Sequence, residues 1–361
     1  MSSGFPIAMQ SKAAEKPAAA AAGVYTHISQ WPVYALAWSH RGASCSPRLA
    51  VGSFLEDYTN KVEVVQFNPD SSVFYTDTRL VFEHPYAPTN IMFLPSEASD
   101  GTELLVTSGD YLRVWGVHHD RVEMRSHLNS RRSSKFSSAI TSFDWAAFDL
   151  ARIVACSVDT TCSVWDLEKE AVEAQLVAHE KEVYDVSWGG TSVFASVSGD
   201  GSVRVFDLRD KERSTIIYEN PSVPGIEQRQ PLLRLEWNKA DPRFMATFGL
   251  DSSVVVILDI RLPAAPLVEL NRHLGSVNAV SWAPRDGRHL CSVGDDSRAL
   301  IWDVVGATRH DSGGGNNGTD NMVEPEMWHE STAPVNNVRW SPVEVDCIAV
   351  TFSNKLQLLR V

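Results

Sequence analysis

A short run of alternating apolar residues that ends on an aromatic side chain recurs seven times along this 361-residue chain. Neighbouring copies are 55, 52, 43, 49, 45 and 58 residues apart. The shorter spacings match the roughly 40 to 45 residues of a four-stranded repeat unit, which must stack on its neighbours to bury its apolar faces. The seven aromatic residues are Trp38, Phe93, Trp145, Trp188, Trp237, Trp282 and Trp340.

A second alternating run follows each of these aromatic residues. Its period of two, with many β-branched and aromatic residues, is typical of a β-strand. Two of the second runs contain the Trp-Asp dipeptide of WD repeats, at Trp165-Asp166 and Trp302-Asp303. We therefore predict an all-β fold, a seven-bladed WD-repeat β-propeller. The second runs cover residues 61–67, 112–115, 162–167, 203–208, 255–260, 299–304 and 356–361.

The last run ends on Val361, which leaves the seventh blade without an outer strand. Residues 24–28 are predicted to supply that strand and so close the ring, because closure removes an exposed edge. The propeller then spans residues 24–361, and residues 1–23 are predicted to form a flexible tail. Insertions between blades are predicted at 118–137, 219–231 and 306–333, and the last is expected to be flexible because it is rich in Gly and Asn.

In the fourth and sixth blades a His residue precedes the first strand, and Ser and Asp residues follow at matching positions. Such sets could be nucleophilic Ser-His-Asp triads, but a triad would occur once and not twice at equivalent repeat positions. We interpret them as buried hydrogen-bond networks that tie the entry loop of a blade to its turn and inner strands. The residues are His179, Ser196 and Asp200 in one blade, and His273, Ser292, Asp296 and Trp302 in the other.

Composition restricts the class of partner. The formal net charge of −13 repels phosphate backbones, so direct nucleic-acid binding is disfavoured. A basic run of Arg and Lys at 121–135 lies in a polar segment and is interpreted as a loop. Five widely spaced Cys residues with no metal-binding spacing indicate a reduced compartment. With no long apolar segment, the chain is expected to be neither secreted nor membrane-spanning.

No motif for catalysis or cofactor binding appears. The sequence has no phosphate-binding loop, no dinucleotide-binding glycine pattern and no His-Glu-x-x-His. His84 beside Glu83, and the pair His118-His119, are the only enzyme candidates, and we interpret each as a loop or packing residue. We expect a non-catalytic protein with no cofactor and no metal.

Several blocks of the chain are similar to one family in particular. The sequence from 24 to 361 resembles the plant Transparent Testa Glabra and light-regulated WD-repeat proteins and their animal counterpart, a cullin-four-associated WD factor. The plant resemblance implies an adaptor between MYB and basic helix-loop-helix transcription factors, or a clock role. The animal resemblance implies partners among kinases and ubiquitin ligases. The blocks are residues 82–86, 108–115, 159–162, 178–183 and 193–219.

Two strand ends resemble the Trp-Asp-x-Arg box by which such propellers dock onto the damaged-DNA-binding adaptor of cullin-four ligases. They are Asp207-Leu208-Arg209 and Asp259-Ile260-Arg261, which lack only the Trp. The resemblance implies docking through Arg209 and Arg261. The alternative is an exposed Arg that pairs with Asp210 or a similar carboxylate.

Together these features predict a monomeric scaffold for proteins that assembles regulatory complexes, present in cytoplasm and nucleus. The alternative is a substrate receptor of a cullin-four ubiquitin ligase, or a kinase scaffold. The partners are expected to be transcription factors, kinases or the cullin-four adaptor, with no nucleic acid and no membrane. The loops that lead into each first strand, with the turns that follow it, are the expected partner face.

Overall fold

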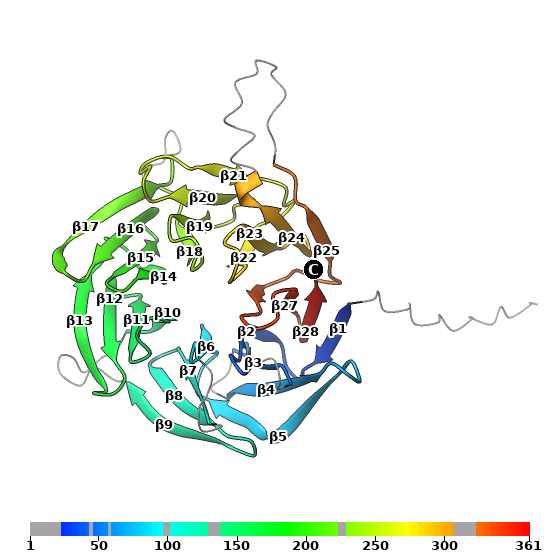
Figure 1. Cartoon of the computed structure of the whole chain (residues 1–361). Coiled ribbons are helices and arrows are strands. Elements are labelled where there is room, and N and C mark those ends of the chain that lie inside the picture. Colours follow the sequence, from blue (N-terminus) through cyan, green and yellow to red (C-terminus); the bar gives the residue numbers. More distant parts are fainter. Residues whose placement is uncertain are drawn as a thin grey trace, which may run out of the picture.

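The computed structural model describes residues 23–42, 46–56, 59–96, 102–128, 138–222, 229–306 and 323–361. In these residues the chain forms seven four-stranded antiparallel sheets, arranged as blades in a ring (Figure 1). Six blades are meanders in which consecutive strands are neighbours, and the seventh takes its outer strand from the other end of the chain. The first strand of each blade faces the centre of the ring. The predicted seven-bladed WD-repeat β-propeller is confirmed.

Blades one to four follow the chain in order. Their strands are β2 (Val33–Trp38), β3 (Arg48–Ser53), β4 (Asn60–Asn68) and β5 (Val73–His84); β6 (Ile91–Phe93), β7 (Glu103–Thr107), β8 (Leu112–Val117) and β9 (Val122–Leu128); β10 (Ile140–Trp145), β11 (Arg152–Ser157), β12 (Thr161–Asp166) and β13 (Ala171–Val177); and β14 (Val183–Gly190), β15 (Val193–Ser198), β16 (Ser202–Asp207) and β17 (Asp210–Glu219).

Blades five to seven complete the ring. Their strands are β18 (Leu232–Trp237), β19 (Phe244–Gly249), β20 (Val255–Asp259) and β21 (Val268–Leu270); β22 (Val277–Trp282), β23 (His289–Gly294), β24 (Arg298–Asp303) and β25 (Met327–Glu330); and β26 (Asn337–Trp340), β27 (Cys347–Phe352), β28 (Lys355–Arg360) and β1 (Val24–Ile28).

The repeated aromatic residues lie where the periodicity requires. All seven are buried near the end of a first strand, and the second alternating runs form the third strands. Three of the Trp side chains bond to the preceding blade: the indole nitrogens of Trp38, Trp188 and Trp282 donate to the backbone carbonyls of Arg339, Asp144 and Glu236 at 2.9, 3.1 and 3.1 Å. These three anchors therefore both fill the core and join neighbouring blades, whereas Trp145, Trp237 and Trp340 bond to carbonyls of their own blades.

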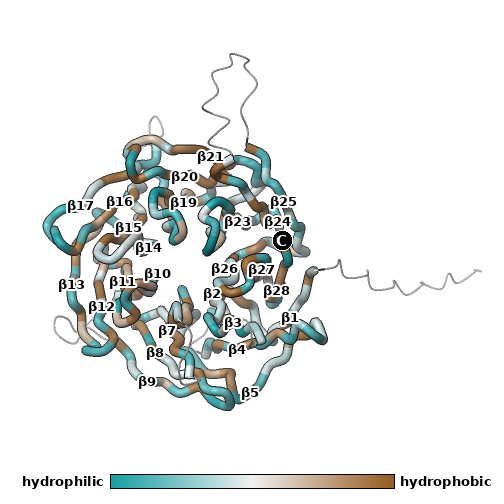
Figure 2. The backbone as a smooth tube through the Cα atoms, viewed as in Figure 1, coloured by the Kyte–Doolittle hydropathy of each residue, from teal (hydrophilic) through white to brown (hydrophobic). Residues whose placement is uncertain are grey.

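The core lies between blades rather than within one sheet. Val154 and Cys156 of blade three, for example, pack in one cluster with Val183, Val186 and Trp188 of blade four. Hydrophobic segments accordingly recur in every blade (Figure 2). Burying one such aliphatic or aromatic side chain stabilises the fold by about 1.5 to 3 kcal/mol. Each blade therefore depends on its two neighbours for stability.

The ring is closed by the two ends of the propeller. Strand β1 pairs antiparallel with β28, with Val24 opposite Leu359 and Ile28 opposite Lys355. The seventh sheet thus contains three strands from the C-terminal end of the chain and one from the N-terminal end. The predicted closure by residues 24–28 is confirmed.

Two predicted insertions are shorter than expected. Within 118–137, β9 is the outer strand of blade two, and within 306–333, β25 is the outer strand of blade six. The outer edge of each third strand has backbone N–H and C=O groups that need hydrogen-bond partners. A short outer strand can supply these partners, even where the neighbouring sequence is rich in Gly and Asn. Residues 1–22, 129–137, 223–228 and 307–322 lie outside the described residues, so the predicted tail and the Gly-rich part of the last insertion stay predictions.

The two ends of the blades make two faces. Loops between second and third strands, and loops from one blade to the next, lie together on what we call the upper face. Loops between first and second strands, and between third and fourth strands, lie on the lower face. Among the described residues, no helix has the length and hydropathy needed to cross a membrane.

Candidate functional site

The predicted network of blade four is assembled on the upper face. His179 Nδ1 lies 3.0 Å from Asp200 Oδ2, and its Nε2 lies 2.7 Å from Ser196 Oγ. Ser202 Oγ adds a hydrogen bond to Asp200 Oδ1 at 2.7 Å. The loop that enters the blade is thereby fastened to the turn between its second and third strands.

The predicted network of blade six has the same geometry and a fourth member. His273 Nδ1 is 3.0 Å from Asp296 Oδ2, its Nε2 is 2.8 Å from Ser292 Oγ, and Trp302 Nε1 donates to the same Ser292 oxygen at 2.8 Å. Burial lowers the pKa of His273, which keeps the imidazole neutral. The geometry fits a Ser292 hydroxyl that donates to Nε2 and an Nδ1–H that donates to the carboxylate.

A third network, in blade two, was not predicted. His84 Nε2 lies 3.1 Å from Thr107 Oγ1, Trp115 Nε1 donates to the same oxygen at 3.0 Å, and His84 Nδ1 lies 2.5 Å from the backbone carbonyl of Tyr86. Thr replaces Ser, and a carbonyl replaces the Asp carboxylate. Burial lowers the pKa of His84 to about 4. The signal in the sequence was a His before the first strand with a Trp on the third.

These networks do not have the accessibility of catalytic sites. The Ser196 and Ser292 side chains are fully buried, so no substrate carbonyl reaches them. His118, the other enzyme candidate, lies 2.9 Å from Glu123 Oε1 at a hairpin of the lower face, and His119 is exposed beside it. Fastening loops is the role that this geometry fits.

One group of metal-ligand type occurs among the described residues, formed by Glu344, Asp346 and Cys347. Burial, together with Glu344, raises the pKa of the Cys347 thiol to about 12. The thiolate that would bind a metal is therefore scarce at neutral pH. The described Cys residues are all buried, and burial likewise raises the pKa of Cys162 to about 12.

Arg209 and Arg261 lie on the lower face of the adjacent blades four and five, and both side chains are mostly exposed. Each makes a two-pronged ion pair with the Asp two residues before it. Arg209 Nε and Nη2 donate to Asp207 at 2.9 and 2.5 Å, and the same distances join Arg261 to Asp259. Hydrogen bonds from Arg209 lower the pKa of Asp207 to about 2. Arg209 therefore pairs with Asp207 and not with Asp210, the partner that the sequence suggested for an exposed arginine.

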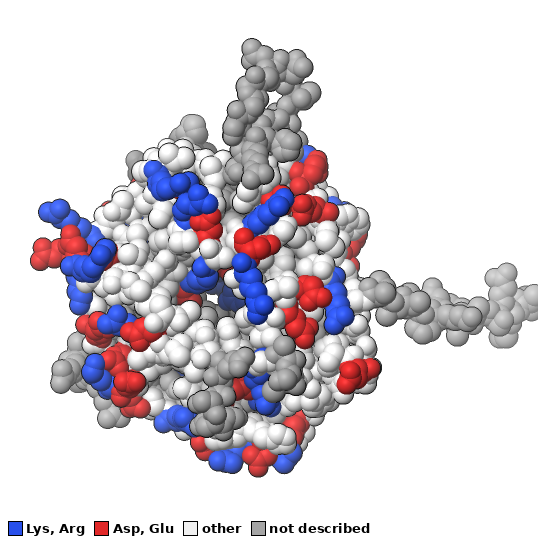
Figure 3. All heavy atoms as spheres, viewed as in Figure 1, with Lys and Arg blue, Asp and Glu red and all other residues white. Residues whose placement is uncertain are grey.

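Sequence reasoning missed that this motif is repeated. Arg243 makes the same kind of pair with Asp241 at 2.5 Å in blade five, and Arg288 pairs with Asp303 in blade six. The Asp-x-Arg spacing at 241–243 was a signal for the first of them. On the face of the molecule seen in Figure 3, Lys and Arg side chains accordingly lie beside Asp and Glu side chains. Positive charges lie beside negative ones, so the face is polar but has no strong net electrostatic potential of either sign.

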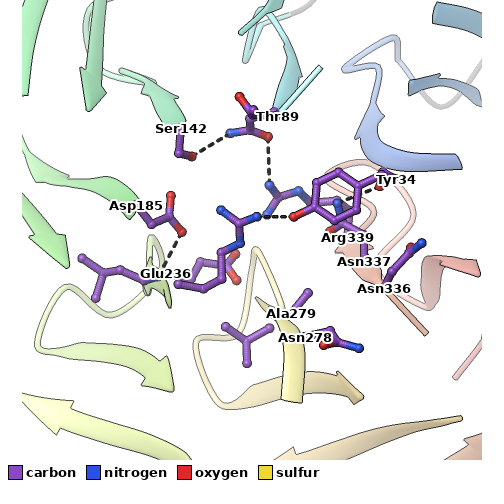
Figure 4. A pocket seen from close by; sticks show the side chains of 14 residues that line it. Tyr34, Thr89, Ser142, Asp185, Glu236, Asn278, Ala279, Asn336, Asn337 and Arg339 are labelled. Carbon is purple, nitrogen blue, oxygen red and sulfur yellow. Dashed lines mark hydrogen bonds between the residues drawn. The ribbon is translucent and has the colours of Figure 1, made fainter. Parts of the chain in front are cut away.

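A polar channel runs through the centre of the ring. Its walls come from all seven blades, and the cavity occupies about 430 Å³, including the part open to solvent. Side chains from different blades point into a common space, Tyr34, Asp185, Glu236 and Arg339 among them (Figure 4). Two arginines cross it: an Nη2 of Arg234 donates to the Tyr34 hydroxyl, and an Nη2 of Arg339 donates to Asn90 Oδ1 at 3.3 Å.

Amides in the channel also join neighbouring blades. Asn337 Nδ2 of blade seven donates to the Tyr34 carbonyl of blade one at 3.0 Å, and Asn90 of blade two donates to the Phe143 carbonyl of blade three at 2.9 Å. First strands of adjacent blades splay apart and leave carbonyls that these side chains satisfy. Sequence reasoning missed them because each pairs with a different repeat.

Comparisons with known proteins identify the family. The model of the WD domain, G-beta repeat, matches residues 171–207 and 264–303. Over 94% of its length the chain is 43% identical to the "DDB1- and CUL4-associated factor 7 homolog" of Dictyostelium discoideum, and it covers 98% of that protein. The chain belongs to the cullin-four-associated WD factor family.

Two further relatives that match most of the chain are yeast proteins. The chain is 32% identical to the WD repeat-containing protein YPL247C of Saccharomyces cerevisiae, over 94% of this chain and 77% of that one. It is 31% identical to the WD repeat-containing protein C17D11.08 of Schizosaccharomyces pombe, over 92% of this chain and 88% of that one.

The repeat model and the networks coincide. The two matched segments are those that contain the complete networks of His179 and His273. The other blades of the chain keep the four strands but lack this complete set of network residues. The resemblance to the cullin-four-associated WD factor family is confirmed, and the fold and family are those of WD-repeat proteins of the scaffold type.

Proposed function

We propose that this chain is a protein scaffold that joins a cullin-four ubiquitin ligase by docking its lower face onto a DDB1-type adaptor. The observation that carries the proposal is the similarity, over nearly the full length of both proteins, to a relative whose name states association with DDB1 and CUL4. Because the similarity spans all seven blades, it includes the lower-face loops as well as the repeat signature.

Arg209 and Arg261 are the residues proposed to make the contact. Both lie on one face of adjacent blades, and each guanidinium is held in position by its Asp partner. A planar guanidinium binds a carboxylate or carbonyl through parallel donors and is a favoured residue at interfaces. Separating an exposed ion pair costs little free energy, so a carboxylate or carbonyl on the adaptor can accept hydrogen bonds that Arg209 and Arg261 now donate to Asp207 and Asp259.

The test is co-purification of the wild-type chain and an Arg209→Ala, Arg261→Ala double variant from native cells. The double variant is expected to lose most of the DDB1-type adaptor, by at least tenfold. The matched control is Arg79→Ala, because Arg79 makes the same pair with Asp77 on the outer strand β5, in blade one rather than in blades four and five. Equal recovery of the adaptor by wild type and double variant would contradict the docking proposal.

We also propose which proteins the scaffold carries. The blocks at 82–86, 108–115, 159–162, 178–183 and 193–219 support transcription factors of the MYB and basic helix-loop-helix types, clock components, or kinases as clients, in cytoplasm and nucleus. Mass spectrometry of the same purification, done on separate nuclear and cytoplasmic fractions, tests this. Recovery of the adaptor with none of these client classes would contradict the client proposal and leave the ligase proposal standing.

A further inference from the structure

The upper face carries exposed apolar side chains, of which Ile28 and Val177 lie at the ends of the outer strands β1 and β13. They belong to turns and blade-to-blade segments of several blades, and Val177 and Leu274 are 81% and 80% exposed. Exposed apolar side chains with polar groups between them are typical of an interaction surface. The lower face also carries several, among them Val73, Phe148 and Leu262, so these residues do not by themselves select the upper face. The upper-face residues are Ile28, Phe54, Val158, Val177, Leu250 and Leu274.

The central channel contains two unusual arginines. Within the described residues, neither Arg234 nor Arg339 has a carboxylate oxygen within 4.0 Å of a guanidinium nitrogen, although both are only partly accessible. Other arginines of similar or greater burial do: Arg48 lies 2.6 Å from Glu103, and Arg113 lies 2.5 Å from Asp110. A guanidinium has five N–H donors, and the hydrogen bonds of Arg234 and Arg339 use one each.

The acidic groups nearby are already occupied or partly neutral. Asp185 accepts backbone N–H groups of Val186 and Leu235, both at 3.0 Å. Glu236 accepts the N–H of Trp282 at 3.2 Å, and burial raises the pKa of Glu236 to about 7. Neither carboxylate therefore makes a direct ion pair with Arg234 or Arg339, and both guanidiniums keep N–H donors available within the channel.

An anion brought between the two guanidiniums gains charge-assisted hydrogen bonds, which are stronger than bonds to a hydroxyl or an amide oxygen such as Arg234 and Arg339 now make. We propose that the upper mouth of the channel binds an acidic side chain, a carboxylate or a phosphorylated residue, on a segment of a partner protein. The apolar neighbours of that side chain contact the apolar residues of the upper face. This rests on the proposed scaffold function and assigns its client site to Arg234 and Arg339.

Short-range contact, not long-range attraction, governs this recognition. The whole chain carries a net charge of −13, which repels acidic segments at a distance. Inside the channel, charge-assisted hydrogen bonds in a water-poor space are strong. The expected client segment therefore contains one or two acidic residues among apolar ones, rather than an acidic run.

The first test is a phage-displayed library of random twelve-residue peptides, selected on the full chain. The wild type is expected to enrich peptides in which an acidic residue is flanked by apolar residues. An enriched peptide is then synthesised with Glu, Gln or phosphoserine at that position, and binding is measured by fluorescence anisotropy. The Gln peptide is expected to bind at least tenfold more weakly than the Glu peptide, and the phosphoserine peptide tells which acid is preferred.

The second test changes the protein. Arg234→Met and Arg339→Met are each expected to weaken the Glu peptide at least tenfold without lowering the thermal unfolding midpoint, while Arg234→Lys retains part of the affinity. Leu274→Glu is expected to weaken it at least fivefold. Arg285→Met, which removes an exposed arginine bonded to the Pro342 carbonyl, is the matched control and is expected to have no effect.

Two outcomes would overturn the proposal: a library that enriches no acidic residue, or Glu and Gln peptides that bind wild type equally. The peptide comparison uses wild type only, so it decides the question even if a channel variant misfolds. The lower-face test is separate, because Arg234→Met should still co-purify with the DDB1-type adaptor. Loss of the adaptor from the Arg209, Arg261 variant together with unchanged peptide binding would uphold both proposals.

Discussion

At the scale of single residues, buried polar groups decide which side chains are charged. His273, kept neutral by burial, accepts the Ser292 hydroxyl proton on one nitrogen and donates to Asp296 from the other, so this network is satisfied without an ion on the imidazole. Glu236 is a different case. Its carboxyl lies in the channel wall near Arg339, Lys239 and Asp144, and burial outweighs the two cations.

The Glu236→Gln variant tests that balance. Because the folded chain raises the pKa of Glu236 from 4.5 to about 7, it binds more protons than the unfolded chain between these values, and stability falls as pH rises through this window. Gln keeps the acceptor for the Trp282 N–H and cannot ionise. The free energy of unfolding of the variant, relative to wild type, is expected to rise by about 1 to 3 kcal/mol as the pH increases from 4.5 to 8. Urea unfolding at several pH values measures this difference. A difference that does not change with pH would show that Glu236 does not titrate in this window.

At the scale of elements, the outer strands are the variable part of the blades. They run from three residues in β21 to twelve in β5, while all first strands are anchored by the same aromatic position. The outer strand pairs on one side only, so its length is free to vary. Strand β1 is the exception, because it joins the two ends of the ring.

Removal of β1 is expected to weaken the whole ring. A chain starting at Ser29 loses the β1–β28 pairing and exposes the edge of β28. We expect a loss of about 2 to 5 kcal/mol from the missing hydrogen bonds and packing, with self-association through the open edge. The control is a chain that starts at Gly23 and keeps β1. Urea unfolding and light scattering measure both effects, and equal stability of the two chains would show that β1 does not hold the ring.

At the scale of the whole molecule, the propeller separates two surfaces by the length of its strands. The lower face carries the Arg-Asp pairs, and the upper face carries the channel mouth with its apolar surroundings. The inter-blade hydrogen bonds and packed cores make the body between them stiff. A stiff body can hold a client and an adaptor at once and raise their effective concentration toward each other.

A stiff body also predicts weak coupling between the faces. The affinity of an upper-face peptide is expected to change by less than twofold when a saturating DDB1-type adaptor is bound below, as measured by fluorescence anisotropy with and without adaptor. Coupling requires two states that the ligands favour unequally, and the closed ring offers no evident second state. A change of tenfold or more would mean that the blades rearrange on docking.

The periodicity of the sequence by itself predicted most of the fold. The aromatic anchors from Trp38 to Trp340 and the alternating runs placed seven blades, and the run ending at Val361 required the strand at 24–28. These features are local or repeat at a fixed spacing, so a single sequence displays them. The His179 and His273 networks were visible for the same reason, since both repeat one pattern.

Only the tertiary structure decided what meets across the ring. Arg234 reaches Tyr34 over 200 positions of sequence, and Arg339 reaches Asn90 over 249. Neither pair recurs at the equivalent position of another blade, so no repeated spacing in the sequence predicts it. The strand β25 was likewise hidden beside a Gly-rich stretch, because an outer strand is determined by the edge it pairs with rather than by its own residues. Closure of the ring brings unlike repeats face to face, and that is why the channel could not be derived from the pattern of any one of them.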